Sequence, residues 1–208
     1  MSGYSVQSIP ELVDSIGEDG IRTLISEFSC PINLEIETFV KNSSIDFANQ
    51  KISVTHFLLD EDYHIVAIFT LAHKAIEIDV SKMSATSRKK VARYAEIDKN
   101  TGKYTVSAFL IAQFGKNMTN GISSDIPCGN EIMKCVMDTL KDVQRMVGGG
   151  IVYLECEDKP ALLHWLCSEF SVNAYPHGKT VHILRSSEPE AEAEPPPLAA
   201  RSVLDRLA

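Results

Sequence analysis

The sequence predicts a mixed α/β fold, of the α+β kind, in which a mixed central β-sheet is flanked by helices. Three observations support this fold class. Apolar residues recur at helical spacing near the N-terminus, β-rich runs follow from residue 52, and residues 104–157 have the pattern of a strand, a helix and a strand. A chain of 208 residues has the length of one domain with a tail.

The first half of the chain is expected to form two helices and a β-hairpin. Residues 9–28 and 32–50 carry helix-spaced apolar side chains, although Gly17 and Gly20 can break the first helix. Residues 52–78 then contain two β-rich runs around an acidic turn segment, which predicts the hairpin.

The second half is expected to alternate helices and strands. A basic helix over 84–97 that starts near Ser84 or Thr86 precedes a long strand at 103–115 and the strongest helix of the chain at 130–147. The stripe of that last helix consists of Ile132, Met133, Val136, Met137, Leu140, Val143 and Val147, and three glycines end it. A buried strand at 151–157, a helix at 159–170 and a closing strand at 180–186 complete the predicted order.

The composition changes abruptly after residue 187. We expect residues 1–187 to form the folded domain and 188–208 to be a tail, whose acidic, proline-rich first part is a disordered linker. Its last residues place Ala200, Val203, Leu204 and Leu207 on one face of a short amphipathic helix, which can dock on the core or on a partner chain.

Charge, cysteines and apolar runs exclude several classes of protein. No apolar run has the roughly 20 residues of a membrane span, and no secretory signal is visible, so we expect a cytoplasmic protein. Five scattered cysteines without a C-x-x-C pair, and histidines without metal spacing, predict reduced core thiols and no metal site. The net charge of -8 disfavours a broad nucleic-acid surface, although a local basic patch over 88–93 can meet RNA or coenzyme A phosphates.

The strand–helix–strand unit is the part of the chain that suggests chemistry. Its first strand ends in small and polar residues, "AFLIAQFGKN", and leads through a loop to Gly129 and a helix N-terminus. Unpaired N–H groups and the positive end of a helix dipole favour phosphate at such a terminus. An ordinary strand end and an ordinary first residue of a helix are the simpler alternatives.

The whole chain, from about residue 5 to 186, resembles the GNAT (Gcn5-related N-acetyltransferase) family, in the group of compact bacterial acetyltransferases and acetyltransferase toxins. The segment "FLIAQFGKN" stands in the place of the family's fourth strand, and "DIPCGNEIMKCVMDTL" in that of its phosphate-binding loop and helix. The segment "IVYLECEDKPALLHWL" stands in the place of the fifth strand and the helix after it. The resemblance implies the GNAT acyl-CoA N-acyltransferase fold.

The resemblance also implies a binding site for acetyl-CoA. In the family the fourth and fifth strands splay apart and receive the pantetheine arm, while the loop and helix N-terminus bind the diphosphate. Gly115 would be small so that the arm can enter, and Asn117 would begin the phosphate loop. The residues that the resemblance assigns to cofactor binding are Phe114, Gly115, Lys116, Asn117, Ser124, Asp125, Ile126, Pro127, Cys128, Gly129 and Asn130.

The sequence departs from the family at two places. The usual phosphate signature is reduced to its last position, Gly129, and Leu166 stands where the family has the tyrosine that protonates the departing thiolate. Tyr175, in a loop that folds back, is the expected substitute and Ser168 a weaker one, with packing as the alternative role of Tyr175. Glu155 is the expected general base, with Glu157 on the same face of its strand and a solvated strand end as the alternative.

These residues predict an acetyl-CoA-dependent N-acetyltransferase that transfers the acetyl group directly to a primary amine in a ternary complex. The amine can belong to a small molecule, a protein or an aminoacyl-tRNA, and a homodimer is compatible with the sequence. Two alternatives are a catalytically weakened acyl-CoA-binding or interaction module and a toxin that acetylates aminoacyl-tRNA.

Overall fold

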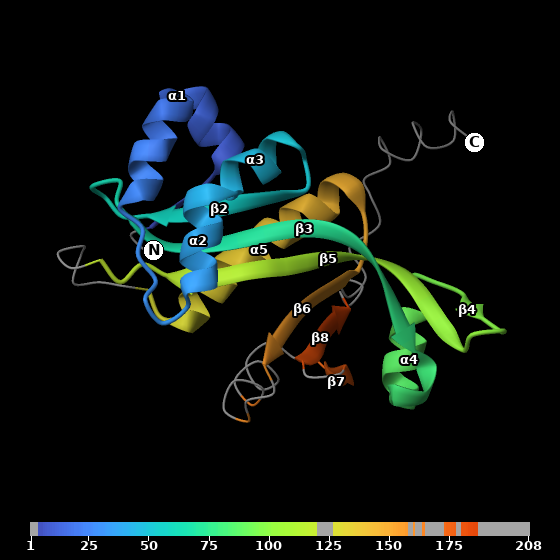
Figure 1. Cartoon of the computed structure of the whole chain (residues 1–208). Coiled ribbons are helices and arrows are strands. Elements are labelled where there is room, and N and C mark those ends of the chain that lie inside the picture. Colours follow the sequence, from blue (N-terminus) through green and yellow to red (C-terminus); the bar gives the residue numbers. More distant parts are fainter. Residues whose placement is uncertain are drawn as a thin grey trace, which may run out of the picture.

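The chain folds around an eight-stranded mixed sheet with helices on both faces (Figure 1), which confirms the predicted fold class. The computed structural model describes residues 4–119, 127–157, 160, 164, 173–177 and 180–186, with the backbone alone at 156–157 and in the last two ranges. Seven strands follow the order β1-β2-β3-β5-β6-β8-β7, and β4 pairs with the outer part of β5. The strands are β1 (Ser5–Ser8), β2 (Ser53–Leu59), β3 (Ile65–Asp79), β4 (Ile97–Asp98), β5 (Lys103–Lys116), β6 (Ile151–Glu157), β7 (Asn173–His177) and β8 (Thr180–Ser186).

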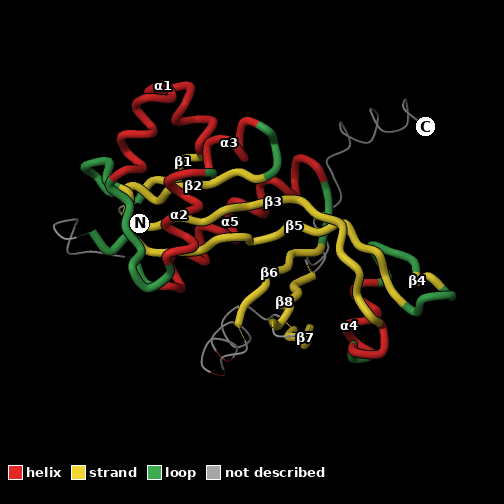
Figure 2. The backbone as a smooth tube through the Cα atoms, in the orientation of Figure 1, coloured by secondary structure: helices red, strands yellow, loops and turns green. Residues whose placement is uncertain are grey.

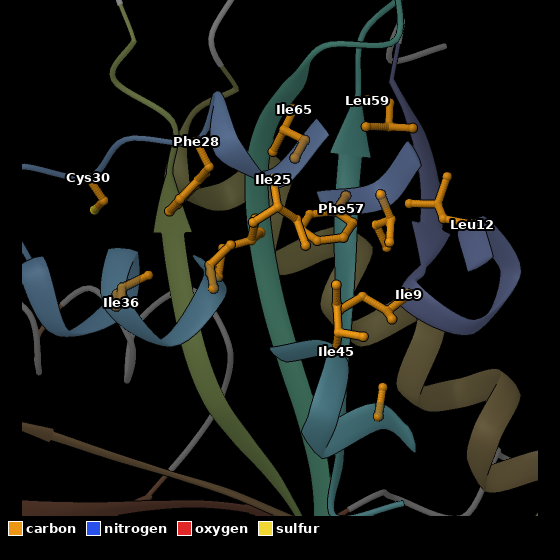
Figure 3. Packing of buried hydrophobic residues seen from close by; sticks show 14 residues of the cluster. Ile9, Leu12, Ile25, Phe28, Cys30, Ile36, Ile45, Phe57, Leu59 and Ile65 are labelled. Carbon is orange, nitrogen blue, oxygen red and sulfur yellow. The ribbon is translucent and has the colours of Figure 1, made fainter. Parts of the chain in front are cut away.

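Helices α1, α2 and α3 cover one face of the sheet and α5 covers the other (Figure 1). On the first face, β2 and β3 contribute Phe57, Leu59 and Ile65 to a cluster with Ile9 and Phe28 (Figure 3). Each of these five side chains is at most 2% exposed, and burying such a side chain contributes about 1.5–3 kcal/mol. The helices are α1 (Ile9–Ser26), α2 (Leu34–Asn42), α3 (Ser44–Asn49), α4 (Ala85–Val91) and α5 (Gly129–Val147).

The N-terminal helices begin and break at identifiable residues. Ser8 caps α1 in a capping box with Glu11. Gly17, at a φ of 74°, kinks the helix at a position where the sequence predicted a break. The predicted helix over 32–50 is two helices, because the chain turns at Ser43. The hydroxyl of Ser44 donates to the Val40 carbonyl there.

A long arm extends β3 and β5 beyond the rest of the sheet. The ladder between the two strands runs from Ala67 and Lys116 to Asp79 and Lys103, and α4 and β4 lie at its far end (Figures 1 and 2). Ser84 caps α4, as the sequence predicted, but the helix ends at Val91. We call residues 74–103 the basic arm, because they hold eight Lys and Arg against four Asp and Glu.

Three short strands were not predicted from the sequence. β1 has four residues and β4 two, which is too short for a clear alternation of apolar and polar side chains. β7 contains Pro176 and lies at the edge of the sheet. Proline has no N–H to donate to a ladder, and it is tolerated in an edge strand because that position can face away from the neighbouring strand. The predicted helix at 159–170 lies mostly outside the described residues, as does the tail from 187 to 208; Pro160 and His164 are helical.

The predicted apolar stripe packs α5 against the sheet. Ile132, Met133, Val136 and Leu140 are at most 3% exposed, whereas Val147 at the C-terminus is 71% exposed. Gly148, at a φ of 75°, ends the helix as predicted. Among the described residues, no helix is both long and apolar enough to cross a membrane.

Candidate cofactor site

Strands β5 and β6 separate in the middle of the sheet. Their parallel ladder consists of three pairs, from Phe109 with Val152 to Ile111 with Leu154. Both strands continue, β5 to Lys116 and β6 to Glu157, and their backbones diverge beyond the last pair (Figure 2). The sheet therefore opens between two neighbouring strands, which we call the β5–β6 opening.

A β-bulge in β5 coincides with the start of the β5–β6 opening. Thr70 of β3 pairs with Gln113, and Leu71 pairs with Ile111, so that Ala112 is an additional residue in β5. Such a bulge bends the strand and increases its twist. The bulge thus accounts for the divergence directly after Ile111.

The alternation of an antiparallel ladder determines which peptide groups of β5 face the opening. The N–H of Asn117 donates to the carbonyl of Val66 in β3 at 3.0 Å. Hydrogen-bonded pairs alternate along an antiparallel ladder, so the peptide groups of Gly115 and Gln113 also bond to β3. The peptide groups of Phe114 and Lys116 consequently face the side of β6. The Phe114 side chain packs against the core beneath α5.

Gly115 has a different neighbour from the one that the sequence suggested. A Cβ atom at this position would lie 3.2 Å from Cγ2 of Ile36 and 3.8 Å from Sγ of Cys30. The missing side chain therefore leaves room for α2 and the loop before it. The contact with Ile36 is by itself a reason for glycine at this position, and the role of Gly115 in admitting a cofactor arm stays a prediction.

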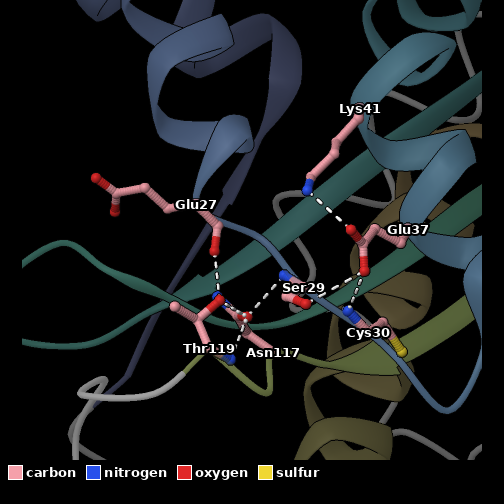
Figure 4. Close-up of polar contacts among 7 residues, drawn as sticks. All are labelled: Glu27, Ser29, Cys30, Glu37, Lys41, Asn117 and Thr119. Atoms are coloured by element: carbon pink, nitrogen blue, oxygen red, sulfur yellow. Dashed lines mark hydrogen bonds and ion pairs between the residues drawn. The ribbon is translucent and has the colours of Figure 1, made fainter.

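Asn117 holds the end of β5 to the segment that follows α1 (Figure 4). Its side chain is 1% exposed, and its Nδ2 donates to the Ile65 carbonyl at 2.8 Å. Its Oδ1 accepts from the Ser29 N–H at 2.9 Å and from both the N–H and the hydroxyl of Thr119. These hydrogen bonds make Asn117 a structural anchor of the end of β5, and its role in cofactor binding stays a prediction.

A second polar contact fixes the loop between α1 and α2 (Figure 4). The Glu37 carboxylate accepts from the N–H of Cys30 at 2.7 Å and from Nζ of Lys41 at 2.8 Å. These hydrogen bonds, that of Lys41 most strongly, lower the pKa of Glu37. The loop beside the end of β5 is thus held from two directions, by Asn117 and by Glu37.

The N-terminus of α5 carries an acidic residue that the sequence analysis did not single out. Cys128 is the N-cap, and its N–H donates to Oε2 of Glu131 at 2.7 Å. Hydrogen bonds from the backbone and the thiol of Cys128, followed by the charge of Lys116, lower the pKa of Glu131. The spacing Cys128-x-x-Glu131 is that of a capping box, with cysteine in place of the usual serine or threonine.

The predicted diphosphate residues are partly described. Pro127 is buried, Cys128 and Asn130 are exposed, and Gly129 is the first residue of α5. Cys128 is therefore not a core thiol, whereas Cys30 is buried. Ser124, Asp125 and Ile126 lie outside the described residues, and so does Ser168.

The predicted catalytic residues are spread over two strands. Glu155 is exposed on β6, directly after the last pair with β5. Burial and, to a smaller extent, the charge of Glu155 raise the pKa of Tyr153, which agrees with a shared face of the strand. Tyr175 lies in β7 rather than in a returning loop, and β8 separates it from β6. Two strand spacings, about 10 Å, thus separate its backbone from that of β6.

No protein-family model matches the chain, and no curated protein matches its sequence. Among solved structures, AtaT complexed with acetyl-methionyl-tRNAfMet matches with a TM-score of 0.60 and 11% identity over 99% of both chains. A tyrosine-to-phenylalanine mutant of KacT matches with a TM-score of 0.62 and 14% identity, and AtaTR bound with acetyl-CoA with 0.59 and 12%; both comparisons cover 89% of this chain and 95% of the other.

These similarities establish the fold. The chain has the fold of the GNAT acetyltransferases, as the resemblance implied, and the solved structures to which it is similar are the toxins AtaT and KacT. The β5–β6 opening and the N-terminus of α5 occupy the part of the chain in which the sequence predicted the cofactor site.

Proposed function

We propose that the protein is an acetyl-CoA-dependent N-acetyltransferase that acts on a primary amine in a ternary complex. The observation that carries the proposal is the β5–β6 opening beside the N-terminus of α5, in a chain with the GNAT fold. One of the similar structures, AtaTR, is bound to acetyl-CoA. The cofactor would supply the activated acetyl thioester. The chain would bind the cofactor and accept a proton from the acceptor ammonium.

The described residues fit such a cofactor. The peptide groups of Phe114 and Lys116 face the opening and can hydrogen-bond to the amides of a pantetheine arm. The diphosphate would be held by residues 124–130 and the first turn of α5. The Lys116 ammonium lies near enough to this turn for its charge to act on Glu131. Glu155, exposed at the start of the opening, is the proposed base for the acceptor ammonium.

A second observation favours aminoacyl-tRNA as the acceptor. The basic arm has a net charge of +4, whereas the remainder of the chain has -12. The thirteen residue steps of β5 between Lys103 and Lys116 place the outer end of the arm, which carries α4, about 40 Å along the strand from Lys116. The arm is thus too far away for cofactor phosphates, and a polyanionic acceptor is the better explanation of its charge.

The first experiment measures cofactor binding and turnover in parallel. We expect millimolar acetyl-CoA to raise the melting temperature, because it binds the folded state, and an amine panel to produce thiol release. Absence of a melting shift would contradict the proposal. A shift without release for any amine, charged tRNA included, would support the binding module instead.

The second experiment tests the acceptor. Lys89→Glu with Arg93→Glu reverses two charges of the basic arm, and Lys141→Glu with Arg145→Glu makes the same change on α5. We expect only the arm variant to lose acetylation of aminoacyl-tRNA, by about tenfold or more at moderate salt, with a small amine unaffected. Equal losses in both variants would show an effect of net charge alone. A homodimer, docking of the C-terminal helix and a bacterial cytoplasmic location stay predictions.

A further inference from the structure

Three exposed cations of α4 and the turn after it form no ion pair with a carboxylate among the described residues. They are Arg88, Lys89 and Arg93, which we call the α4 cations. Arg88 donates from Nε to the Met83 carbonyl at 3.1 Å, which is a neutral partner. Other cations of the described chain do pair with carboxylates, namely Arg22, Lys41, Lys103, Lys141 and Arg145.

Most carboxylates of the basic arm are engaged elsewhere. Glu77 pairs with Lys103 at 2.6 Å, across the ladder of β3 and β5. Asp79 and Asp98 each accept a hydrogen bond from the backbone N–H two residues further along, at 2.8 Å in both cases. The α4 cations therefore leave positive charge exposed on the surface of the arm, where an anionic ligand can bind.

The chain leaves its described part beside the α4 cations. Ser186, the last residue of β8, pairs with Ile151 of β6. The residue before Ile151 is Gly150, and a Cβ atom there would overlap the ring of Tyr94, which directly follows Arg93. Two residue steps beyond Ser186, chain connectivity keeps the backbone within about 16 Å of Gly150. The tail thus begins next to the turn that follows α4.

The first residues of the tail carry the complementary charge. Glu188, Glu190, Glu192 and Glu194 stand at every second position, with only proline or alanine between them. We call residues 188–194 the acidic segment. Its charge of -4 is equal and opposite to that of the basic arm. Seven residues can span about 20 Å, whereas the seven residues of α4 are about 10 Å long, so the acidic segment has the length to lie along this helix.

We propose that the acidic segment binds the α4 cations of its own chain and competes there with the polyanionic acceptor. The carboxylates of the segment and the phosphates of an RNA require the same cations. Each exposed ion pair is weak and is screened by salt, so the contact forms and breaks readily. The contact follows from the charges and the connectivity, whereas its role in acceptor binding rests on the proposed function, which supplies the polyanion.

Covalent attachment makes a weak contact effective. The effective concentration of a segment tethered this closely is on the order of millimolar. The apparent Kd for RNA rises by the reciprocal of the fraction of arms that are free of the segment. An effective concentration about five times the segment's own Kd leaves about one arm in six free, and therefore weakens RNA binding about sixfold. The tail thus regulates access of the acceptor to the basic arm.

Carbodiimide crosslinking of the full chain tests the contact without RNA. The reagent joins a lysine ammonium directly to a carboxylate that touches it. In dilute buffer we expect Lys89 to be joined to the acidic segment within the monomer. The product should disappear at about 1 M salt, where the screening length is about 3 Å. Lys141 is the control, because it should be joined to Asp138, 2.8 Å away in α5, and not to the acidic segment.

Fluorescence anisotropy with a short labelled RNA measures the competition in the full chain. Glutamine at the four glutamates of the acidic segment should tighten RNA binding about 3- to 10-fold in dilute buffer. The control makes the same change in net charge at four exposed carboxylates of the rest of the chain and should tighten binding less than about twofold. Its substitutions are Asp14→Asn, Glu35→Gln, Glu61→Gln and Asp62→Asn.

A change of the arm locates the competition. In a chain with Lys89→Glu and Arg93→Glu, the four glutamine substitutions of the tail should no longer alter RNA binding. Absence of the Lys89 crosslink, equal tightening in the two sets of four substitutions, or unchanged RNA binding without the four glutamates would each overturn the proposal. Failure of every variant to bind RNA, with the crosslink present, would instead contradict the polyanionic acceptor of the proposed function and leave the contact established.

Discussion

Replacement of Asn117 by alanine tests whether this residue is an anchor or a cofactor ligand. The change leaves the buried Ile65 carbonyl and the partly buried Ser29 N–H without their side-chain partner, Asn117, which is itself 1% exposed. An unsatisfied buried polar group costs about 1–3 kcal/mol, so the free energy of unfolding should fall by about 2–5 kcal/mol. That is a large fraction of the stability of a typical domain.

Urea denaturation of both proteins measures this loss directly. Asn33→Ala is the matched control, because Asn33 is an exposed N-cap of α2 whose loss should cost about 1 kcal/mol. Affinity for acetyl-CoA, measured well below the melting temperature, should change less for Asn117→Ala than its stability does. A variant with wild-type stability that no longer binds acetyl-CoA would refute the anchor and support the ligand assignment.

Two further predictions concern His56 and Glu131. Burial lowers the pKa of His56 to about 4, against the smaller opposing effects of the Val54 backbone and the charge of Glu11, so the unfolded chain binds the proton more tightly. The free energy of unfolding should therefore keep its full value above pH 6.5 and fall by up to about 3 kcal/mol as the pH decreases to 4. Chemical denaturation at each pH measures it, and the same pH dependence in His56→Phe would contradict this reasoning. Glu131→Gln keeps an acceptor for the Cys128 N–H but removes a negative charge from the N-terminus of α5, so acetyl-CoA should bind several-fold more tightly while acetyl-pantetheine, which lacks the diphosphate, does not. Asp142→Asn makes the same charge change at the far end of the helix, and an equal effect there would exclude a local cause.

Periodicity predicted the elements that bury many residues. The stripe of α5 and the long apolar run of β5 are strong local signals, because the core selects their side chains over several turns or pairs. The roles of Gly115 and Asn117 depend instead on Ile36 and Ser29, and the partners Ser29 and Asn117 are 88 positions apart. No local pattern shows which loop a strand end will meet. Glu131 was detectable, had cysteine been allowed as the first residue of a capping box.

The charge of the basic arm makes the molecule an electric dipole. The described residues outside the basic arm, which form the body of the molecule, carry a net charge of -8 and the arm +4, and the two lie at different ends of the long strands β3 and β5. A polyanion that approaches would be repelled from the body and rotated toward the arm, which selects its orientation before contact. With a screening length of about 8 Å at physiological salt, this torque acts only at short range. Orientation should therefore matter more for the association rate in dilute buffer than in the cell.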